Sequence, residues 1–298
     1  MSVSSEKKSL LELLSVPGQD PVFVQKLIEE GADVNETSPY GFTPLMFAAI
    51  FNDNPTIVEM LLEHGADVEA ESNEGMTPLM WALMAETPDH TGQDIGSSLE
   101  REEKRRAVAM QLIRKGSDVN AVCYSPRWLK WTPLLFATLQ PDRNVSLISA
   151  LVEQGAGVNP QTTDGVTPLM HSVFYGWSSD VPHELIQAGA DVNASGGQEG
   201  RRGWTPLLYA LASPYKSLPA VKELVLNQAD VNVVLPNGST PLLFAASLGD
   251  DPAFVELLLS AGANVQARDA GGSTALDVAR AKNYRRVTNV LSKVFRPS

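Results

Sequence analysis

Residues 41–69 read GFTPLMFAAIFNDNPTIVEMLLEHGADVE, and this stretch contains the start and stop signals of two short helices. Thr43 and Pro44 favour a helix start, because a threonine side chain can cap the first turn and proline's missing N–H has no partner there. A second apolar run begins at Ile57. Gly65 favours its end, because glycine readily adopts the left-handed conformation that follows many helices. The stretch therefore predicts two helices joined by a turn.

Both ends of this pattern recur along the chain. Thr-Pro-Leu, or once Thr-Ala-Leu, begins at seven positions: Thr43, Thr77, Thr132, Thr167, Thr205, Thr240 and Thr274. The sequence Gly-Ala-Asp-Val-Asn, or a variant of it, begins at Gly31, Gly65, Gly116, Gly155, Gly189, Gln228 and Gly262. The threonines are 34 to 38 residues apart, except for 55 residues after Thr77. A repeat of this period predicts stacked units that bury their apolar faces against one another.

The repeated pattern resembles the ankyrin repeat, and the resemblance covers nearly the whole chain. Gly41 to Ala49 and Gly65 to Asp67 match the two ends of the family pattern, and Gly238 to Ala246 match its first part again. The resemblance implies an all-α solenoid of about eight stacked helix-turn-helix units with projecting β-turn fingers. The family's histidine after Thr-Pro-Leu is absent, and residues such as Met46 stand in its place. We expect apolar packing there instead.

The repeats predict a single ankyrin-repeat domain over residues 1–298. Residues 1–36 and 272–298 are expected to form capping repeats, because a terminal repeat needs one polar face. Residues 37–271 would then contain six internal repeats. An insertion near 86–106 lies between the helices of one repeat, and its sequence predicts a loop followed by a helical extension. It would form either a solvated extension or a flap at the edge of the groove.

The composition argues against several classes of function. The chain has 35 acidic and 23 basic residues and a net charge of −12, which disfavours binding to nucleic acid or to an anionic membrane. The sequence has no run of 18 apolar residues, so no membrane span is predicted. Cys123 is the only cysteine, so we expect no internal disulfide and a cytoplasmic protein. A secreted effector that acts in the cytosol of a host remains open.

The sequence contains no convincing constellation for catalysis or for cofactor binding. His64, His90 and His183 lie in separate repeats, and none has a second metal ligand at helical spacing. Neither the P-loop pattern nor the dinucleotide-binding glycine pattern occurs. We therefore expect no enzyme activity, no metal and no cofactor. A less favoured alternative is a small-molecule or catalytic pocket between the long fingers and the insertion.

Two fingers are longer than the others and carry basic and aromatic residues. Asp118–Thr132 and Asp191–Thr205 have fifteen residues, whereas an ordinary finger such as Asp33–Thr43 has eleven. We call them the two enlarged fingers. Residues of types that dominate binding hot spots occur in both fingers: Arg127, Trp128, Trp131, Arg201, Arg202 and Trp204.

In ankyrin proteins the residue before each threonine and the end of the first helix commonly face the concave groove. Large side chains at these positions would form an exposed stripe, which indicates an interaction site. The predicted partner-binding residues are Tyr40, Phe42, Phe51, Met76, Arg127, Trp128, Trp131, Phe174, Tyr175, Arg201, Arg202 and Trp204. Trp131 and Trp204 are expected to keep substantial solvent exposure. The alternative is that these side chains pack on neighbouring fingers and stiffen the groove, and both can hold together.

A second row of large residues lies four positions after each threonine and is expected to belong to the core: Phe47, Trp81, Phe136, His171, Tyr209 and Phe244. The function that the sequence favours is non-catalytic binding of another protein through the groove and fingers of a monomer. The alternative in another class is a structural module that associates with itself through the aromatic stripe.

Overall fold

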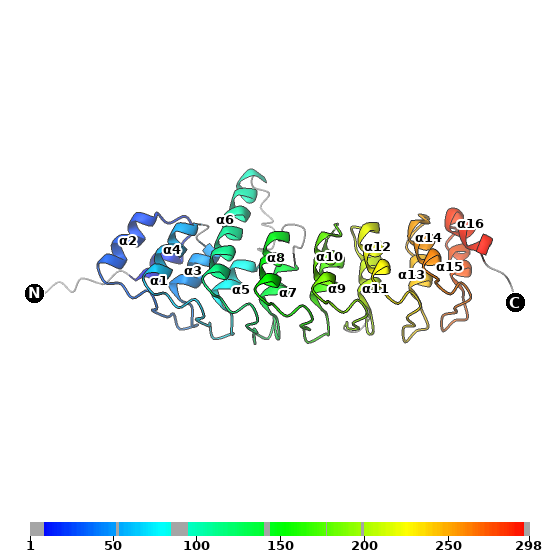
Figure 1. Ribbon diagram of the computed structural model, residues 1–298, viewed down its shortest axis with the longest axis horizontal. Helices are drawn as coiled ribbons and strands as arrows, with labels where there is room; N and C mark the ends of the chain where they lie inside the picture. The colour runs from blue at the N-terminus through cyan, green and yellow to red at the C-terminus, as the bar shows by residue number, and fades with distance from the viewer. Residues whose placement is uncertain are drawn as a thin grey trace, which may run out of the picture. The chain divides into compact units, whose positions relative to one another are not determined.

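The computed structural model describes residues 9–51, 54–84, 95–139, 144–176, 178–197 and 200–294. Within them the chain is helical, and the predicted pairs of helices and fingers are present (Figure 1). In the described residues, Gly196 and Trp204 form an isolated antiparallel β-bridge. The predicted loop of the insertion, near 86–94, lies outside the described residues. Its helical extension is confirmed as part of a helix from Ile95 to Arg114.

The chain divides into two compact units. The N-terminal body comprises Met1–Ala137 and Ser146–Gly157. Its helices are α1 (Leu10–Leu14), α2 (Pro21–Glu29), α3 (Pro44–Phe51), α4 (Pro55–Glu63), α5 (Pro78–Leu83), α6 (Ile95–Arg114), α7 (Pro133–Ala137) and all but the first residue of α8 (Val145–Glu153).

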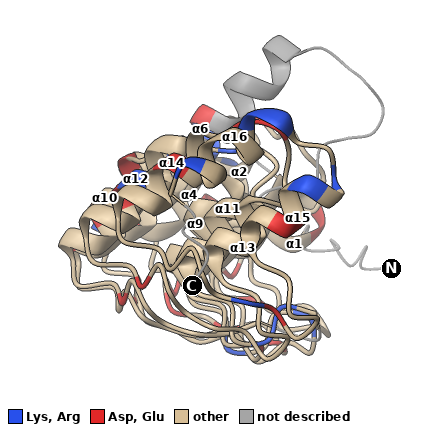
Figure 2. Cartoon of the chain, turned by 90° about the vertical axis from the view of Figure 1, so that its right-hand side faces the viewer, with Lys and Arg blue, Asp and Glu red and all other residues tan. Residues whose placement is uncertain are grey.

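The C-terminal body comprises Thr138–Val145 and Val158–Ser298. Its helices are α9 (Pro168–Tyr175), α10 (Asp180–Gln187), α11 (Pro206–Ala212), α12 (Leu218–Leu226), α13 (Pro241–Ala245), α14 (Ala253–Ser260), α15 (Ala275–Ala281) and α16 (Arg285–Val294). Figure 2 shows basic residues beside α15 and α16, where Arg280, Arg285 and Arg286 are exposed.

The first helix of most repeats begins as the sequence predicts. The side-chain oxygen of Thr77 accepts a hydrogen bond from the amide of Met80 at 3.3 Å, and Thr167 caps α9 in the same way. Thr274 forms a capping box with Asp277, and hydrogen bonds from the backbone and side chain of Thr274 lower the pKa of the Asp277 carboxyl. These bonds satisfy amides that would otherwise lack partners in the first turn.

The core lies between the first helices of successive repeats. The apolar residues that replace the family's histidine are buried, and Met46, Met80 and Met170 have no exposed surface, whereas Asp277 at the same position of the last repeat is exposed. The expected apolar packing at this position is therefore confirmed. Flexible methionine side chains fill irregular space between helices well, so the loss of the histidine leaves no hole.

Asparagines of the fingers connect successive repeats within each body. Asn35 donates its side-chain amide to the carbonyl oxygen of Gly65, and its own oxygen accepts from the amide of Asp67, both at 2.8 Å. The same paired bonds start from four further asparagines: Asn120, Asn159, Asn193 and Asn232. We call this set the asparagine ladder.

Residue 69 interrupts the asparagine ladder. Glu69 accepts from the amide of Asp118 at 2.8 Å, but a carboxylate has no N–H with which to donate the second bond. Partial burial and the nearby charges of Asp118 and Asp67 raise the pKa of Glu69, although the hydrogen bond from Asp118 acts in the opposite direction. The link at this position is therefore weaker than at its equivalents.

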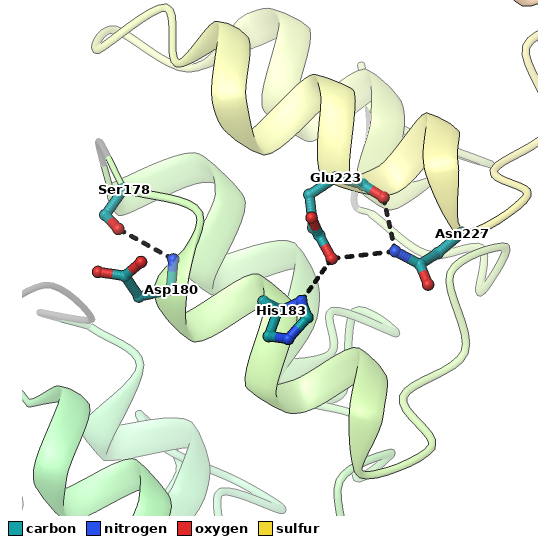
Figure 3. A network of polar contacts seen from close by, with 5 residues as sticks. All are labelled: Ser178, Asp180, His183, Glu223 and Asn227. Carbon is teal, nitrogen blue, oxygen red and sulfur yellow. Dashed lines mark hydrogen bonds and ion pairs between the residues drawn. The ribbon is translucent and has the colours of Figure 1, made fainter.

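The outer helices of the C-terminal body are joined by side-chain contacts (Figure 3). His183 of α10 lies 2.8 Å from the carboxylate of Glu223 on α12, which also accepts from the side chain of Asn227 at 3.0 Å. Near the start of α10, the amide of Asp180 donates to the hydroxyl of Ser178 at 2.9 Å.

Candidate functional site

The first group of predicted residues lies at the start and end of α3. The ring of Phe42 stacks on Phe47 at 5.3 Å and lies 5.1 Å from Trp81 of the next repeat. Phe51, the last residue of α3, is 5.9 Å from Phe47 and is 37% exposed. These rings form a row from a finger to the end of a helix, with its outer end at the surface. We call Phe42, Phe47, Phe51 and Trp81 the first aromatic cluster.

Tyr40 and Met76 occupy fingers of the same body but differ in accessibility. Tyr40 is 73% exposed at a finger tip, and its carbonyl oxygen accepts from the amide of Asn73 in the next finger. Met76 has no exposed surface. Contrary to the prediction made for it, Met76 therefore has no accessible surface with which to contact a partner.

The enlarged finger of residues 118–132 carries the second aromatic cluster, defined as Trp128, Trp131 and Phe136. The two indoles meet edge to face at 4.6 Å, and both approach Phe136, at 5.6 Å and 5.1 Å. The guanidinium of Arg127 lies 4.9 Å from the ring of Trp128. Arg127 is exposed and Trp128 is half-buried, so these two residues form the accessible edge of the cluster.

Trp131 does not keep the exposure predicted for it. It is only 9% exposed, because the extra residues of the finger bring Trp128 back over its ring. Two backbone bonds hold this arrangement, one from Cys123 to the carbonyl of Trp131 and one from Lys130 to the carbonyl of Cys123. Trp131 therefore supports the finger, and the half-buried Trp128 is the more accessible of the two indoles.

The third aromatic cluster belongs to the C-terminal body and comprises Phe174, Tyr175, Trp204, Tyr209 and Phe244. Trp204 contacts Tyr209 of its own repeat and Phe244 of the next, both at 5.5 Å. Phe174 meets Tyr175 edge to face at 5.0 Å and lies 6.1 Å from Tyr209. Trp204 and Phe174 are half-buried, and Tyr175 is 40% exposed. The cluster thus has a buried base and an accessible rim.

Arginines of the second enlarged finger complete this rim. Arg201 lies over three rings of the cluster, with its Cζ atom 4.8 Å from the centroid of Phe174, 5.2 Å from Trp204 and 5.7 Å from Tyr209. Burial raises the pKa of the Tyr209 hydroxyl, while the charge of Arg201 and its hydrogen bond to that hydroxyl act against this shift. Arg201 and Arg202 are both exposed.

The two enlarged fingers change the start of the helix that follows each of them. The hydroxyls of Thr132 and Thr205 are buried and have no hydrogen-bond partner among the described residues, and Thr205 makes no side-chain cap. Thr77 and Thr167, which follow ordinary fingers, do cap their helices. A buried hydroxyl without a partner costs about 1–3 kcal/mol. The enlarged fingers are therefore built at some expense of stability.

The row four positions after each threonine was expected to belong to the core, and this is confirmed for Phe136, His171 and Tyr209. Phe47, Trp81 and Phe244 are only half-buried. The structure shows that this row forms the base on which the finger aromatics lie. One row lies one position before each threonine and the other four positions after it, and this constant separation of five residues was the signal that could have joined them.

Tyr124 is an exposed aromatic residue of an enlarged finger that was not among the predicted partner-binding residues. Tyr124 of the first enlarged finger is 52% exposed, and its hydroxyl donates to the carboxylate of Glu71 at 3.1 Å. Its ring covers Gly75, where an added Cβ atom would collide with it. The close approach of a ring to a glycine in another repeat leaves no pattern in the local sequence.

A cavity lies on the outer helices of the C-terminal body, away from the fingers. It has a volume of about 510 Å³, and residues around it include Asp180, His183, Glu184 and Glu223. Among the described residues, no group of three or more His, Cys, Asp or Glu side chains is placed to hold a metal ion. The same part of the chain contains no helix with the length and apolar character needed to cross a bilayer.

Comparison with known proteins identifies the type of repeat. The sequence model described as ankyrin repeats, in three copies, matches residues 14–91, 101–196 and 207–294. Neurogenic locus notch homolog protein 2 of Homo sapiens is 30% identical over 176 residues, which cover 54% of this chain and 7% of that protein. Neurogenic locus notch homolog protein 1 of Xenopus laevis is 31% identical over 155 residues, covering 52% of this chain and 6% of that protein.

These relatives share only the repeat region with this chain, since it spans 7% or less of their length. The family match is far broader and includes both bodies. It agrees with the paired helices, the capping threonines and the fingers that the structure describes. This chain belongs to the ankyrin repeat family.

Proposed function

We propose that this chain is a non-catalytic module that binds another protein through its fingers and the C-terminal ends of its first helices. Ankyrin repeats are in general protein-interaction modules and in general not enzymes. A cytoplasmic location is part of the proposal, because the single thiol of Cys123 is buried and free. Neither nucleic acid nor a membrane is proposed as a partner, since the chain carries a net charge of −12.

One observation carries the proposal: aromatic side chains at equivalent positions are exposed and at the same time held in place by other rings. Phe51 ends α3 and Tyr175 ends α9, and they are 37% and 40% exposed. Each has a ring of its own repeat against it, Phe47 at 5.9 Å and Phe174 at 5.0 Å. A side chain that is already ordered loses little conformational freedom on binding, which favours affinity.

The structure refines which residues support the proposal. The accessible members in the N-terminal body are Tyr40, Phe42, Phe51, Arg127 and Trp128. Those in the C-terminal body are Phe174, Tyr175, Arg201, Arg202 and Trp204. Met76 and Trp131 are left out because they are buried. The alternative, that the aromatic side chains stiffen the fingers, applies to the packed base of each cluster. Binding is proposed for the accessible rim of the same clusters, so both can hold together.

The proposal is tested with binders selected from a displayed library of random peptides on the full chain. Selected peptides are then titrated against Phe51→Ala and Tyr175→Ala, with Phe23→Ala as the matched control. Phe23 is 61% exposed but lies on the second helix of its repeat. We call Phe51→Ala and Tyr175→Ala the groove variants. We expect at least one of them to weaken binding about 10-fold or more, which equals about 1.4 kcal/mol, and the control to have no effect.

Two results would contradict the proposal. One is a set of binders whose affinity falls with Phe23→Ala and not with the groove variants. The other is binders that are insensitive to all three substitutions although each variant melts at the temperature of the parent chain.

A further inference from the structure

The third aromatic cluster borders a small cavity of about 270 Å³. Its lining combines aromatic rings with two charged groups: Asp164, Val166, His171, Phe174, Tyr175, Arg201 and Tyr209. Pockets for small molecules usually measure about 300–1,000 Å³. This cavity is below that range, so its size favours one side chain of a larger partner over a whole small molecule.

The backbone of the second enlarged finger fixes the side of the cavity that carries Arg201. Gly196 and Trp204 exchange two backbone hydrogen bonds of 3.0 Å each, and the amide of Gly197 donates to the carbonyl oxygen of Asp164. A Cβ atom on Gly196 would stand 2.0 Å from the carbonyl oxygen of Gly165. This approach is open only to glycine, and it places the finger directly against its neighbour.

Arg201 is held by the surrounding aromatic side chains. Stacking over Phe174, Trp204 and Tyr209 at 4.8 to 5.7 Å uses the attraction between a cation and the faces of aromatic rings. The five N–H donors of a guanidinium lie in its plane; the hydrogen bond to the Tyr209 hydroxyl uses part of this edge, and the remaining donors can bind a planar anion. A carboxylate fits such an edge with two parallel hydrogen bonds.

The apolar part of the cavity lies beside this edge. Phe174, Tyr175 and Val166 are accessible at its rim, whereas Tyr209 and His171 form a buried base at 4% and 9% exposure. Tyr175 and Arg201 are both exposed, so an extended chain can cross the rim. Arg202 adds a second exposed cation, and Asp164 is the one acidic group in the lining.

We infer that this cavity recognises an extended peptide segment of the partner in which an internal acidic residue is followed by an aromatic one. The carboxylate pairs with the edge of Arg201, and the aromatic side chain enters the cavity against Phe174 and Tyr175. This inference rests on the proposed protein-binding function and adds the chemistry of the partner. The finger arginines supply the charge that an acidic segment needs on an otherwise acidic chain.

The experiment uses blocked dipeptides as probes of the full chain. Acetyl-Glu-Phe-amide is titrated by NMR while the indole N–H signals are followed, and acetyl-Gln-Phe-amide is the neutral control. We expect the glutamate probe to bind about 10-fold more tightly or better. Arg201→Gln should abolish the difference between the probes, and Arg202→Gln should leave most of it, since the ring contacts in the described part of the chain involve Arg201 and not Arg202. Asp164→Asn should strengthen binding of the glutamate probe.

The inference is overturned if the two probes bind equally or if neither binds. It also fails if Arg202→Gln acts as strongly as Arg201→Gln, which would indicate general charge attraction. Tighter binding of acetyl-Phe, with its free terminal carboxylate, than of the internal glutamate probe would also overturn it. Selected library peptides that depend on Tyr175 but need no carboxylate would uphold the proposed function and reject this inference, so the two failures are distinct.

Discussion

At the scale of single residues, Glu69 shows how one side chain can weaken a repeated link. Its equivalents Asn35 and Asn120 each make two bonds to the next repeat, whereas Glu69 makes one. The amide of an asparagine offers both a donor and an acceptor, and a carboxylate offers acceptors alone. The asparagine ladder therefore has a defined place at which it can be improved.

We expect Glu69→Asn to raise the free energy of unfolding at neutral pH by about 1 kcal/mol, the usual net value of one added hydrogen bond. The pKa of Glu69 is raised in the folded protein, so its ionised form destabilises the fold. That penalty is present above the folded pKa and disappears as the pH falls towards the ordinary glutamate value. The advantage of the variant should therefore shrink on acidification, as urea titrations at several pH values can show.

The reverse substitution is the control for this prediction. The side chain of Asn232 makes both bonds of the asparagine ladder, to Gly262 at 3.1 Å and to Asn264 at 2.7 Å. In Asn232→Glu only the bond to Asn264 can form. This substitution should lower stability at neutral pH. If Glu69→Asn leaves the free energy of unfolding unchanged or lowers it, the missing hydrogen bond at Glu69 does not destabilise the protein.

At the scale of helices and fingers, the enlarged fingers exchange a helix cap for an accessible aromatic rim. Thr167 accepts a bond from Met170, but the buried hydroxyl of Thr205 has no partner. Valine has nearly the shape of threonine without the hydroxyl. Thr167→Val should therefore cost about 1 kcal/mol of unfolding free energy, as loss of a cap usually does.

Thr205→Val, in contrast, should be neutral or stabilising, because it removes a buried group that has no partner. Chemical denaturation of the two variants under the same conditions measures the difference. A loss with Thr205→Val as large as that with Thr167→Val would mean that the Thr205 hydroxyl is satisfied in solution.

The glycines of the second enlarged finger give a test of its geometry. Gly196→Ala should displace the finger, since its Cβ atom would meet the carbonyl of Gly165. We expect this variant to weaken binding of the acetyl-Glu-Phe-amide probe with only a small loss of melting temperature. Gly249→Ala is the matched control, because nothing lies within 4 Å of its added Cβ atom. Equal effects of the two substitutions would show that the Gly196 contact does not place Arg201.

The sequence predicted the helices far better than the exposure of the finger side chains. Thr-Pro pairs and Gly residues mark helix ends locally, so α5 begins at Pro78 and α9 at Pro168 as expected. The burial of Trp131 depends on how a fifteen-residue finger folds back on itself, and local patterns do not contain that information. For the same reason, the sequence predicted that Arg201 lies in a finger with aromatic residues. It did not predict that its guanidinium would contact three rings.

At the scale of the whole molecule, charge and the spread of apolar residues favour a monomer. The exposed large apolar residues that the structure describes are distributed over several elements, as with Val22 on α2, Phe51 on α3 and Leu226 on α12. Stable homodimers generally bury more than 2,000 Å² of largely hydrophobic surface. A net charge of −12 adds repulsion between copies.

We expect light scattering after size exclusion to give the mass of a single chain, 32.1 kDa, across a wide range of concentrations. A dimer that dissociates on Tyr175→Ala or Phe51→Ala would instead support the alternative of a self-associating module. A dimer that ignores both substitutions would place the contact elsewhere and contradict the monomer prediction alone.

The asparagine ladder also bears on how such a chain can be lengthened. Each rung ends on a carbonyl oxygen and an amide of the next repeat, so it depends on the neighbour's backbone and not on its side chains. A second copy of residues 205–239, inserted after Ser239, would offer Asn232 the same two atoms that Asn193 already uses. Duplication of a repeat within a body therefore preserves the asparagine ladder across the new junction, and the side-chain packing between the two copies is the part that must still adapt.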